Sequence, residues 1–104
     1  MWYAANLLFQ STHIPTESKP TIWEESVRLV QARSEAEARE VAERIGRSKV
    51  QTYQVEDGLV IWKFDRVERI YCILDDELRS GSEVFSRFLR DSEVRSLLTP
   101  FDDE

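Results

Sequence analysis

The 104-residue chain has one cysteine, one histidine, three glycines and three prolines, and these scarcities exclude several classes of protein. A single cysteine cannot form an intramolecular disulfide, so a disulfide-bridged secreted scaffold is excluded. So few glycines and prolines exclude a collagen-like or low-complexity chain. His13 and Cys72 lie far apart in the sequence, whereas zinc needs closely spaced ligands. We therefore expect no metal and no other cofactor.

Long apolar runs are also missing. The apolar segment near the N-terminus, residues 2–9, is much shorter than the roughly 20 residues of a membrane helix. It lacks the basic flank and the small-residue cleavage site of a signal peptide. We therefore expect a cytoplasmic protein with no membrane partner.

The charge balance disfavours nucleic-acid binding. Asp and Glu number 20 against 14 Lys and Arg, a net charge of -6. A general binder of phosphate backbones needs the opposite balance. Three of the acids form a tail at residues 102–104, so the folded body is only mildly acidic. The one feature that favours nucleic-acid binding is a local basic strip of Arg87, Arg90 and Arg95.

Four segments have the patterns of β-strands: residues 2–11, 22–33, 50–55 and 59–74. Asp57-Gly58 predicts a hairpin turn between the last two. The apolar phase changes between Phe64 and Val67, which predicts a bulge near Asp65-Arg66. Residues 12–21 contain two prolines and are interpreted as a loop that could act as a flap.

The clearest local pattern is a helix at residues 34–45. Ser34 followed by Glu37 has the spacing of a capping box. Gly46 stands where a left-handed residue would end the helix. The expected apolar stripe consists of Ala38, Val41, Ala42 and Ile45.

Two further helices are predicted near the C-terminus. One spans residues 83–90, and a short one starts at Asp91 or Ser92 and runs through Leu98. The order β-β-α-β-β-α predicts a single α+β domain over residues 1–104, with about four antiparallel strands and helices on one face. Phe101 could pack back onto it, and residues 102–104 are expected to be solvated.

No catalytic residue can be assigned, because the chain has neither a nucleophile elbow nor a glycine-rich phosphate loop. Glu25 falls on the apolar face of its strand, with Trp23, Val27 and Leu29. A buried carboxylate there would need a partner, although a solvated edge is the simpler interpretation. The candidate ligand-binding residues are Trp23, Glu24, Glu25, Glu83, Ser86 and Arg87.

Aromatic residues make up 11% of the chain, and Trp and Tyr are enriched in interfaces as well as in cores. Helices on one face of the sheet leave the side chains of the other face exposed to water. Residues 2–9 and 70–74 are apolar on both faces, which indicates that another surface covers this second face. We expect a homodimer through that face.

Four segments together resemble a family of bacterial proteins: Trp2-Tyr3-Ala4-Ala5 with Leu7-Leu8-Phe9, Trp23-Glu24-Glu25-Ser26, Ser34-x-x-Glu37-Ala38 with Ala42, and Gly81-x-Glu83-Val84-Phe85-Ser86-Arg87-Phe88. The family is called domain of unknown function 4288. The resemblance implies a small bacterial protein and supplies no activity or cofactor. It singles out Glu24, Glu83, Ser86 and Arg87 as the polar positions in the matching segments.

Two functions remain open from the sequence. The first is a non-enzymatic, self-associating binding or interaction module. The second is a small-ligand-binding protein or enzyme with an aromatic pocket that uses Trp23, Glu25, Arg87 and the segment around His13. The two differ in whether Glu25 and Arg87 converge on one pocket.

Overall fold

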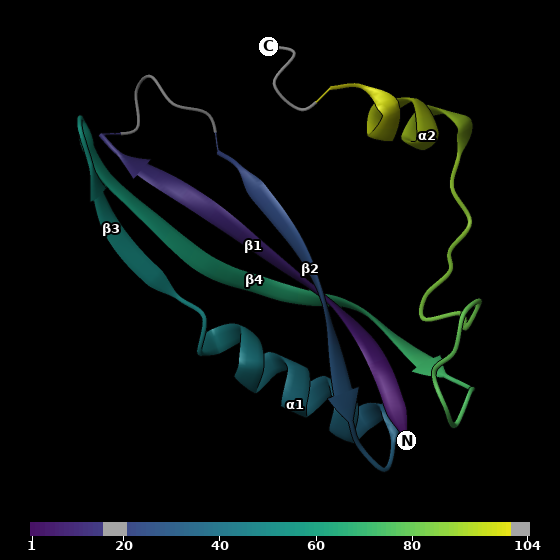
Figure 1. Ribbon diagram of the computed structural model, residues 1–104. Coiled ribbons are helices and arrows are strands. Elements are labelled where there is room, and N and C mark those ends of the chain that lie inside the picture. Colours follow the sequence, from purple (N-terminus) through teal and green to yellow (C-terminus); the bar gives the residue numbers. More distant parts are fainter. Residues whose placement is uncertain (16–20, 101–104) are drawn as a thin grey trace.

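An antiparallel sheet of four strands organises the chain (Figure 1). The computed structural model describes residues 1–15 and 21–100. The strands are β1 (Trp2–Ile14), β2 (Trp23–Gln31), β3 (Gln51–Val55) and β4 (Gly58–Ile73), and the helices are α1 (Glu35–Arg47) and α2 (Asp91–Leu98). Their sequence confirms the predicted α+β order, and the sheet order is β2-β1-β4-β3.

The central strand β1 is longer than expected. It ends at Ile14 because residues 12–14 continue to pair with β4, with His13 opposite Val60. This pairing shortens the predicted loop at its start. The middle of that loop, residues 16–20, lies outside the described residues, as do Phe101 and the predicted tail at residues 102–104.

Helix α1 covers one face of the sheet, called here the helix face. Ser34 caps the helix as predicted, since its hydroxyl accepts a hydrogen bond from the Glu37 amide at 3.1 Å. The completely buried Ala38 and Ala42 bring the helix close to the sheet. The core between them contains alternate residues of β1, namely Tyr3, Ala5, Leu7 and Phe9, with Val30 and Val67.

The expected role of Gly46 is wrong. The helix continues to Arg47, with Ser48 as its C-cap in right-handed conformation, so Gly46 belongs to the last turn. A Cβ at position 46 would lie 2.4 Å from the ring of Phe64. Close packing on that ring, and not a left-handed backbone, is why this position suits glycine.

Strand β4 contains two irregularities. Its pairing with β1 shifts by one residue between Leu8 and Phe9, at Asp65, which confirms the predicted bulge. A second shift between Asn6 and Leu7, at Glu68, was not predicted. Each shift reverses which side chains face α1, so Phe64, Val67 and Ile70 all belong to the core region although they are three residues apart and not two.

The predicted helix at residues 83–90 is wrong, because this segment forms neither a helix nor a strand. Glu83, Phe85 and Arg87, each two residues apart, all contact the sheet, as alternate residues of a non-helical chain can. A helix would turn Phe85 away from the other two. Contacts with the sheet therefore outweigh the weak stability of an eight-residue helix.

The last helix, α2, confirms the prediction of a short helix ending at Leu98 but packs on neither face of the sheet. None of its residues is buried. Figure 1 shows it standing away from the strands. In the described part of the chain, no helix combines the length and apolarity needed to cross a membrane.

Candidate functional site

The face of the sheet opposite α1, called here the open face, carries the main cluster of candidate residues. Its central positions on β1 are Ala4, Asn6 and Leu8, which alternate with the core residues. On the outer strand β2, Trp23, Glu25, Val27 and Leu29 share this face, as predicted. On β4 the matching positions are Lys63, Arg66, Arg69 and Tyr71.

Residues 82–98, called here the arm, start by crossing the open face. The ring of Phe85 packs edge-on against Tyr71, with centroids 5.8 Å apart. The Tyr71 hydroxyl donates a hydrogen bond to Glu83. This bond to a carboxylate is the main reason that the pKa of Tyr71 is raised, because the neutral hydroxyl is the form that can donate. The base of the arm is thus fastened to β4.

Cations reinforce the same attachment. The guanidinium groups of Arg69 and Arg87 both lie about 6 Å from the centre of the Phe85 ring, at 5.9 and 6.0 Å. This distance suits a cation–π contact. The arm residue Arg87 and the sheet residue Arg69 therefore meet over one aromatic ring.

Glu25 and Arg87 lie close together, although Arg87 and not Glu25 lines the cavity described below. Arg87 Nη1 lies 3.9 Å from Glu25 Oε2, and the same carboxylate oxygen accepts a hydrogen bond of 3.0 Å from Asn6 Nδ2. The Glu25 side chain is 42% exposed, so it is neither buried nor fully solvated. Because Asn6 Nδ2 faces Glu25, the oxygen of the same amide, Oδ1, faces away from that carboxylate. Asn6 is 1% exposed, and its Oδ1 has no hydrogen-bond partner among the described residues.

A cavity of about 380 Å³ lies between the base of the arm and β4. Its lining includes the predicted residues Ser86 and Arg87, together with Arg69 and Tyr71. Aromatic and cationic side chains thus share its wall. Such a cavity can accommodate a small polar molecule.

The other predicted residues lie apart from this cavity. Glu24 points to the helix face and lines a separate cavity of about 210 Å³ with Phe9 and Trp62. Trp23 is on the open face, 49% exposed. His13 is at the far end of β1, where it hydrogen-bonds to Asp57 at 3.2 Å. The structure thus brings Glu25, Glu83, Ser86 and Arg87 to one face and separates Glu24 and His13 from them.

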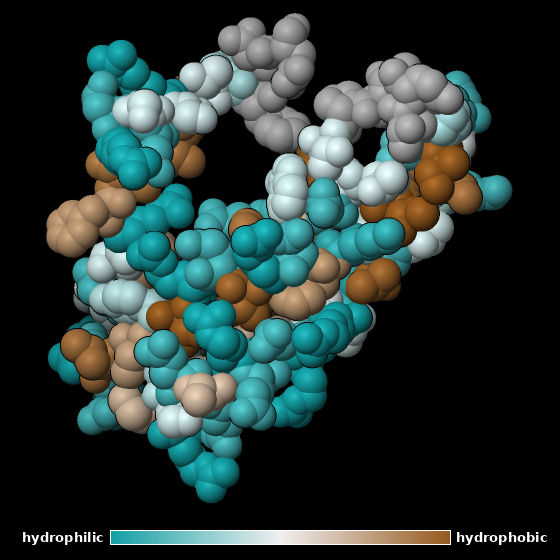
Figure 2. All heavy atoms as spheres, turned by 180° about the vertical axis from the view of Figure 1, so that it is seen from behind, coloured by the Kyte–Doolittle hydropathy of each residue, from teal (hydrophilic) through white to brown (hydrophobic). Residues whose placement is uncertain are grey.

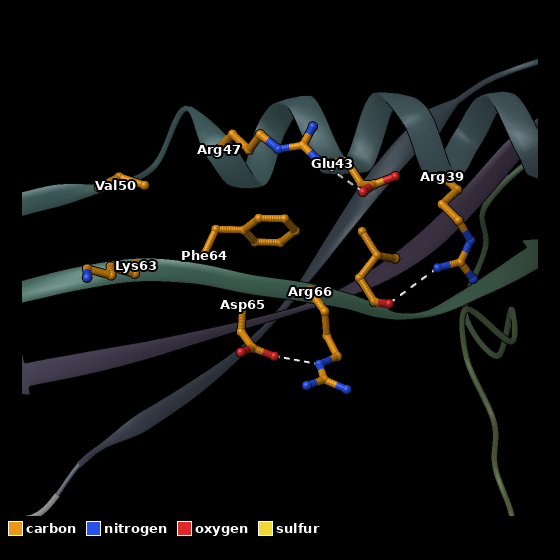
Figure 3. Close-up of a pocket in the computed structure, with 9 residues that line it drawn as sticks. Arg39, Glu43, Arg47, Val50, Lys63, Phe64, Asp65 and Arg66 are labelled. Atoms are coloured by element: carbon orange, nitrogen blue, oxygen red, sulfur yellow. Dashed lines mark hydrogen bonds and ion pairs between the residues drawn. The ribbon is translucent and has the colours of Figure 1, made fainter.

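A larger groove of about 680 Å³ runs between α1 and β4 (Figure 3). Figure 3 shows the Phe64 ring pointing toward α1, whereas Asp65 and Arg66 point away from the helix. Its arginines have partners: Arg39 donates to the Val67 carbonyl oxygen at 3.3 Å, Arg47 pairs with Glu43 at 3.3 Å, and Arg66 pairs with Asp65 at 2.5 Å. The contacts of Arg39 and Arg66 stabilise the backbone between the two bulges, so we assign no ligand to the groove.

Sequence reasoning missed Asn6, Arg69 and Tyr71. Asn6 could have been found, because it is the only polar residue in the apolar run of residues 2–9. A polar side chain in a strand buried on both faces needs a partner or a function. Arg69 and Tyr71 gave no comparable signal, since their role depends on where the arm crosses the sheet.

Comparison with known proteins identifies the family. The family model described as Domain of unknown function (DUF4288) matches residues 2–86. The chain belongs to this family. No curated protein and no solved structure matches this chain. In this DUF4288 member, the matched region contains the whole sheet, α1 and the arm up to Ser86.

The tip of the arm lies beyond the region matched to DUF4288. Phe88 is fully exposed, and on α2 Leu97 and Leu98 are 63% and 79% exposed. With Val94 these leucines form one helical stripe at spacings of three and four residues. Seen from behind, the part of the molecule that holds α2 carries apolar atoms and is separated from the body by a hollow (Figure 2).

Among residues 1–15 and 21–100, no three His, Cys, Asp or Glu side chains are grouped as a metal site would require. The open face offers hydrogen bonding, ion pairing and apolar contact.

Proposed function

We propose that this DUF4288 protein is a non-enzymatic interaction module that forms a homodimer through the open face of its sheet. One observation carries the proposal. Trp23, Val27 and Leu29, called here the apolar stripe, lie on one face of β2, with Glu25 between Trp23 and Val27, and are each about half exposed, at 49%, 52% and 51%. The arm crosses the open face, yet it leaves this stripe uncovered.

The stripe has the composition of an interface. Large apolar side chains that are contiguous on a surface mark association sites more often than scattered ones do. Trp is among the residues enriched at the centres of interfaces. The stripe also lies on an edge strand, where a second copy can approach without displacing a neighbouring strand. A cytoplasmic location is part of the proposal, because reducing conditions there would keep the unpaired Cys72 as a thiol.

The test is the molar mass of the purified chain, measured by light scattering after size exclusion over a range of concentrations. We expect the wild type to have twice the chain mass of 12.2 kDa. The variant with Val27→Asp and Leu29→Asp should have the monomer mass, because two charges would be buried at the interface.

Val50→Asp is the matched control. Val50 is 50% exposed, like Val27, but it lies next to α1 at the edge of the groove on the other side of the sheet. This variant should stay dimeric. A wild type that remains at 12.2 kDa at every concentration would refute self-association.

A second candidate function is the binding of a small molecule where Glu25 and Arg87 lie close together. The unpartnered Asn6 Oδ1 supports it, because a buried acceptor beside a loosely held ion pair is suited to receive a donor. A ligand with two donors could place one beside Glu25, in the position of Arg87, and reach Asn6 Oδ1 with the other. The proposed ligands are therefore small amines and polyols.

Thermal shift against a panel of small amines and polyols tests this second candidate, since a ligand of the native state raises the melting temperature. Asn6→Leu, which removes both amide atoms at similar volume, should abolish any shift. Glu40→Gln, on the exposed side of α1, should leave it unchanged. The absence of any shift across the panel would count against the site.

A further inference from the structure

Two apolar surfaces lack a partner within residues 1–15 and 21–100, and they complement each other. One is the apolar stripe on β2, and the other is the tip of the arm, formed by Phe88 and α2. We infer that each copy of the chain inserts its α2 onto the apolar stripe of a second copy, so that the dimer forms by exchange of arms. This inference rests on the proposed self-association and specifies which surfaces make the contact.

Helix α2 by itself is too short to be stable. It has eight residues, whereas isolated helices shorter than about 12–15 residues are marginal in water. Its ends are well formed locally: the Glu93 carboxylate accepts a hydrogen bond from the Arg90 amide at 2.7 Å, and Asp91 pairs with Arg95 at 2.9 Å. Such exposed contacts contribute only a few tenths of a kcal/mol each. The helix therefore needs a surface against which its apolar side can pack.

The base of the arm determines where that surface can be. Glu83, Phe85 and Arg87 fasten the arm to its own sheet through Tyr71, Arg69 and Glu25. Beyond Arg87 the chain leaves the sheet, and α2 contacts no strand and no other helix. The arm is thus anchored at one end and presented to solvent at the other, an arrangement suited to capture by another molecule.

The apolar stripe is longer than α2. Eight helical residues at about 1.5 Å each make α2 about 12 Å long. The six residue steps from Trp23 to Leu29 span about 20 Å at about 3.3 Å each. A partner's α2, preceded by its Phe88, therefore fits along one stripe.

Charge also favours the pairing. The first turn of α2 is acidic, with Asp91 and Glu93. On the open face, Lys63 of β4 lies in the same row as Trp23, across Gln10, whereas Arg66 and Arg69 pair with Asp65 and Glu68. Opposite charges at the rim of an apolar contact guide the orientation in which two surfaces meet.

In the exchanged dimer, a twofold axis relates two identical arm–stripe contacts. Contacts between these two different surfaces that lack this axis would instead continue into an open filament. In the dimer, each chain gives one arm and receives one. No stripe is left over to bind a third copy.

The first test uses a charge-bearing arm, Leu97→Asp with Leu98→Asp. Both leucines are exposed, so the body should fold normally, which a cooperative urea transition at the wild-type midpoint would verify. We expect this variant to be monomeric in light scattering, at a concentration where wild type is dimeric. Ser92→Asp, a charge added near the polar start of α2, should leave the dimer intact.

The decisive test mixes two defective chains. The stripe variant, Val27→Asp with Leu29→Asp, keeps a normal arm, and the arm variant keeps a normal stripe. Titrating the arm variant into the stripe variant should slow hydrogen exchange at the α2 amides of the stripe variant by tenfold or more. The α2 amides of the arm variant itself should stay unprotected.

The outcomes separate the two proposals. A dimeric wild type whose arm variant is also dimeric would overturn arm exchange and leave self-association standing. A monomeric wild type would overturn both, and protected α2 amides in that monomer would show that α2 folds back onto its own stripe. A mixture in which the stripe variant gains no protection would also overturn the exchange.

Discussion

Phe64 can pack under α1 because position 46 carries a hydrogen where other residues carry a Cβ. The sequence made Gly46 conspicuous for the wrong reason, since a glycine near the end of a helix is usually the residue that terminates it. Here the constraint comes from Phe64, 18 positions away in the chain, which no local pattern can reveal. The sequence does not distinguish a glycine required for close packing from a glycine required for its backbone conformation.

We predict that Gly46→Ala destabilises the fold, although alanine is the better helix former. The new methyl group would lie 2.4 Å from the Phe64 ring, and overpacking of this kind costs about 1–3 kcal/mol. Urea unfolding of the variant measures the loss. In a Phe64→Leu background the ring is gone, so Gly46→Ala should be neutral or stabilising there; an equal loss in both backgrounds would contradict the packing explanation.

Glu25 shows what residue-level reasoning could find. Its position on the apolar face of β2 marked it as misplaced, and the structure gives it Asn6 and Arg87 as partners. The pairing with Arg87 could not be derived, because it depends on residues 83–90 not being helical. A misplaced charge in a sequence thus indicates that a partner exists without identifying it.

At the scale of elements, the start of α1 is held by a carboxylate. Glu37 accepts hydrogen bonds from the Arg33 side chain, at 2.9 Å to Nη2, and from the Arg33 amide, at 2.7 Å. These bonds, from the side chain first, hold the pKa of Glu37 below its ordinary value. The capping pattern was predicted, but the bond reaches Arg33, one residue before the N-cap.

A lowered pKa in the folded state has a defined effect on stability. The charged carboxylate stabilises the fold at pH values above its pKa in the unfolded chain, which is about 4.3. This contribution is lost as the pH falls through the lower folded pKa. We therefore predict that Glu37→Gln lowers the urea midpoint at pH 7 but has much less effect near pH 2.

Glu40→Gln is the control for this prediction, because Glu40 is an exposed carboxylate on the same helix. It should change the midpoint little at either pH. If Glu37→Gln lowered the midpoint equally at both pH values, the hydrogen bonds from Arg33 would not depend on the charge of Glu37.

The segment at residues 83–90 is the element that the sequence misrepresented. Its apolar residues fit a helical stripe, yet eight residues stabilise a helix too weakly to resist competing contacts. Phe85 on Tyr71 and Arg87 beside Glu25 are such contacts. Local sequence patterns predicted α1 correctly, because its apolar stripe is long and its N-cap is strong. They mispredicted residues 83–90, because tertiary contacts determine the conformation of that segment.

At the scale of the whole molecule, the arm makes the chain larger than its length implies. The radius of gyration is 16.6 Å, compared with about 13 Å for a compact domain of this size. The class and order of the elements were predictable from hydrophobic periodicity. The strand order β2-β1-β4-β3 was not, because either hairpin could have paired through either of its strands.

The two bulges in β4 also determine how this strand can change in length during evolution. Each bulge accommodates one residue that has no partner on β1, Asp65 in one and Glu68 in the other. Losing either residue would leave Phe64 opposite Phe9 and Val67 opposite Leu7, so core side chains such as Ile70 would keep facing α1. Single-residue losses should therefore be tolerated at these two positions, whereas elsewhere in β4 they would reverse the faces of the strand.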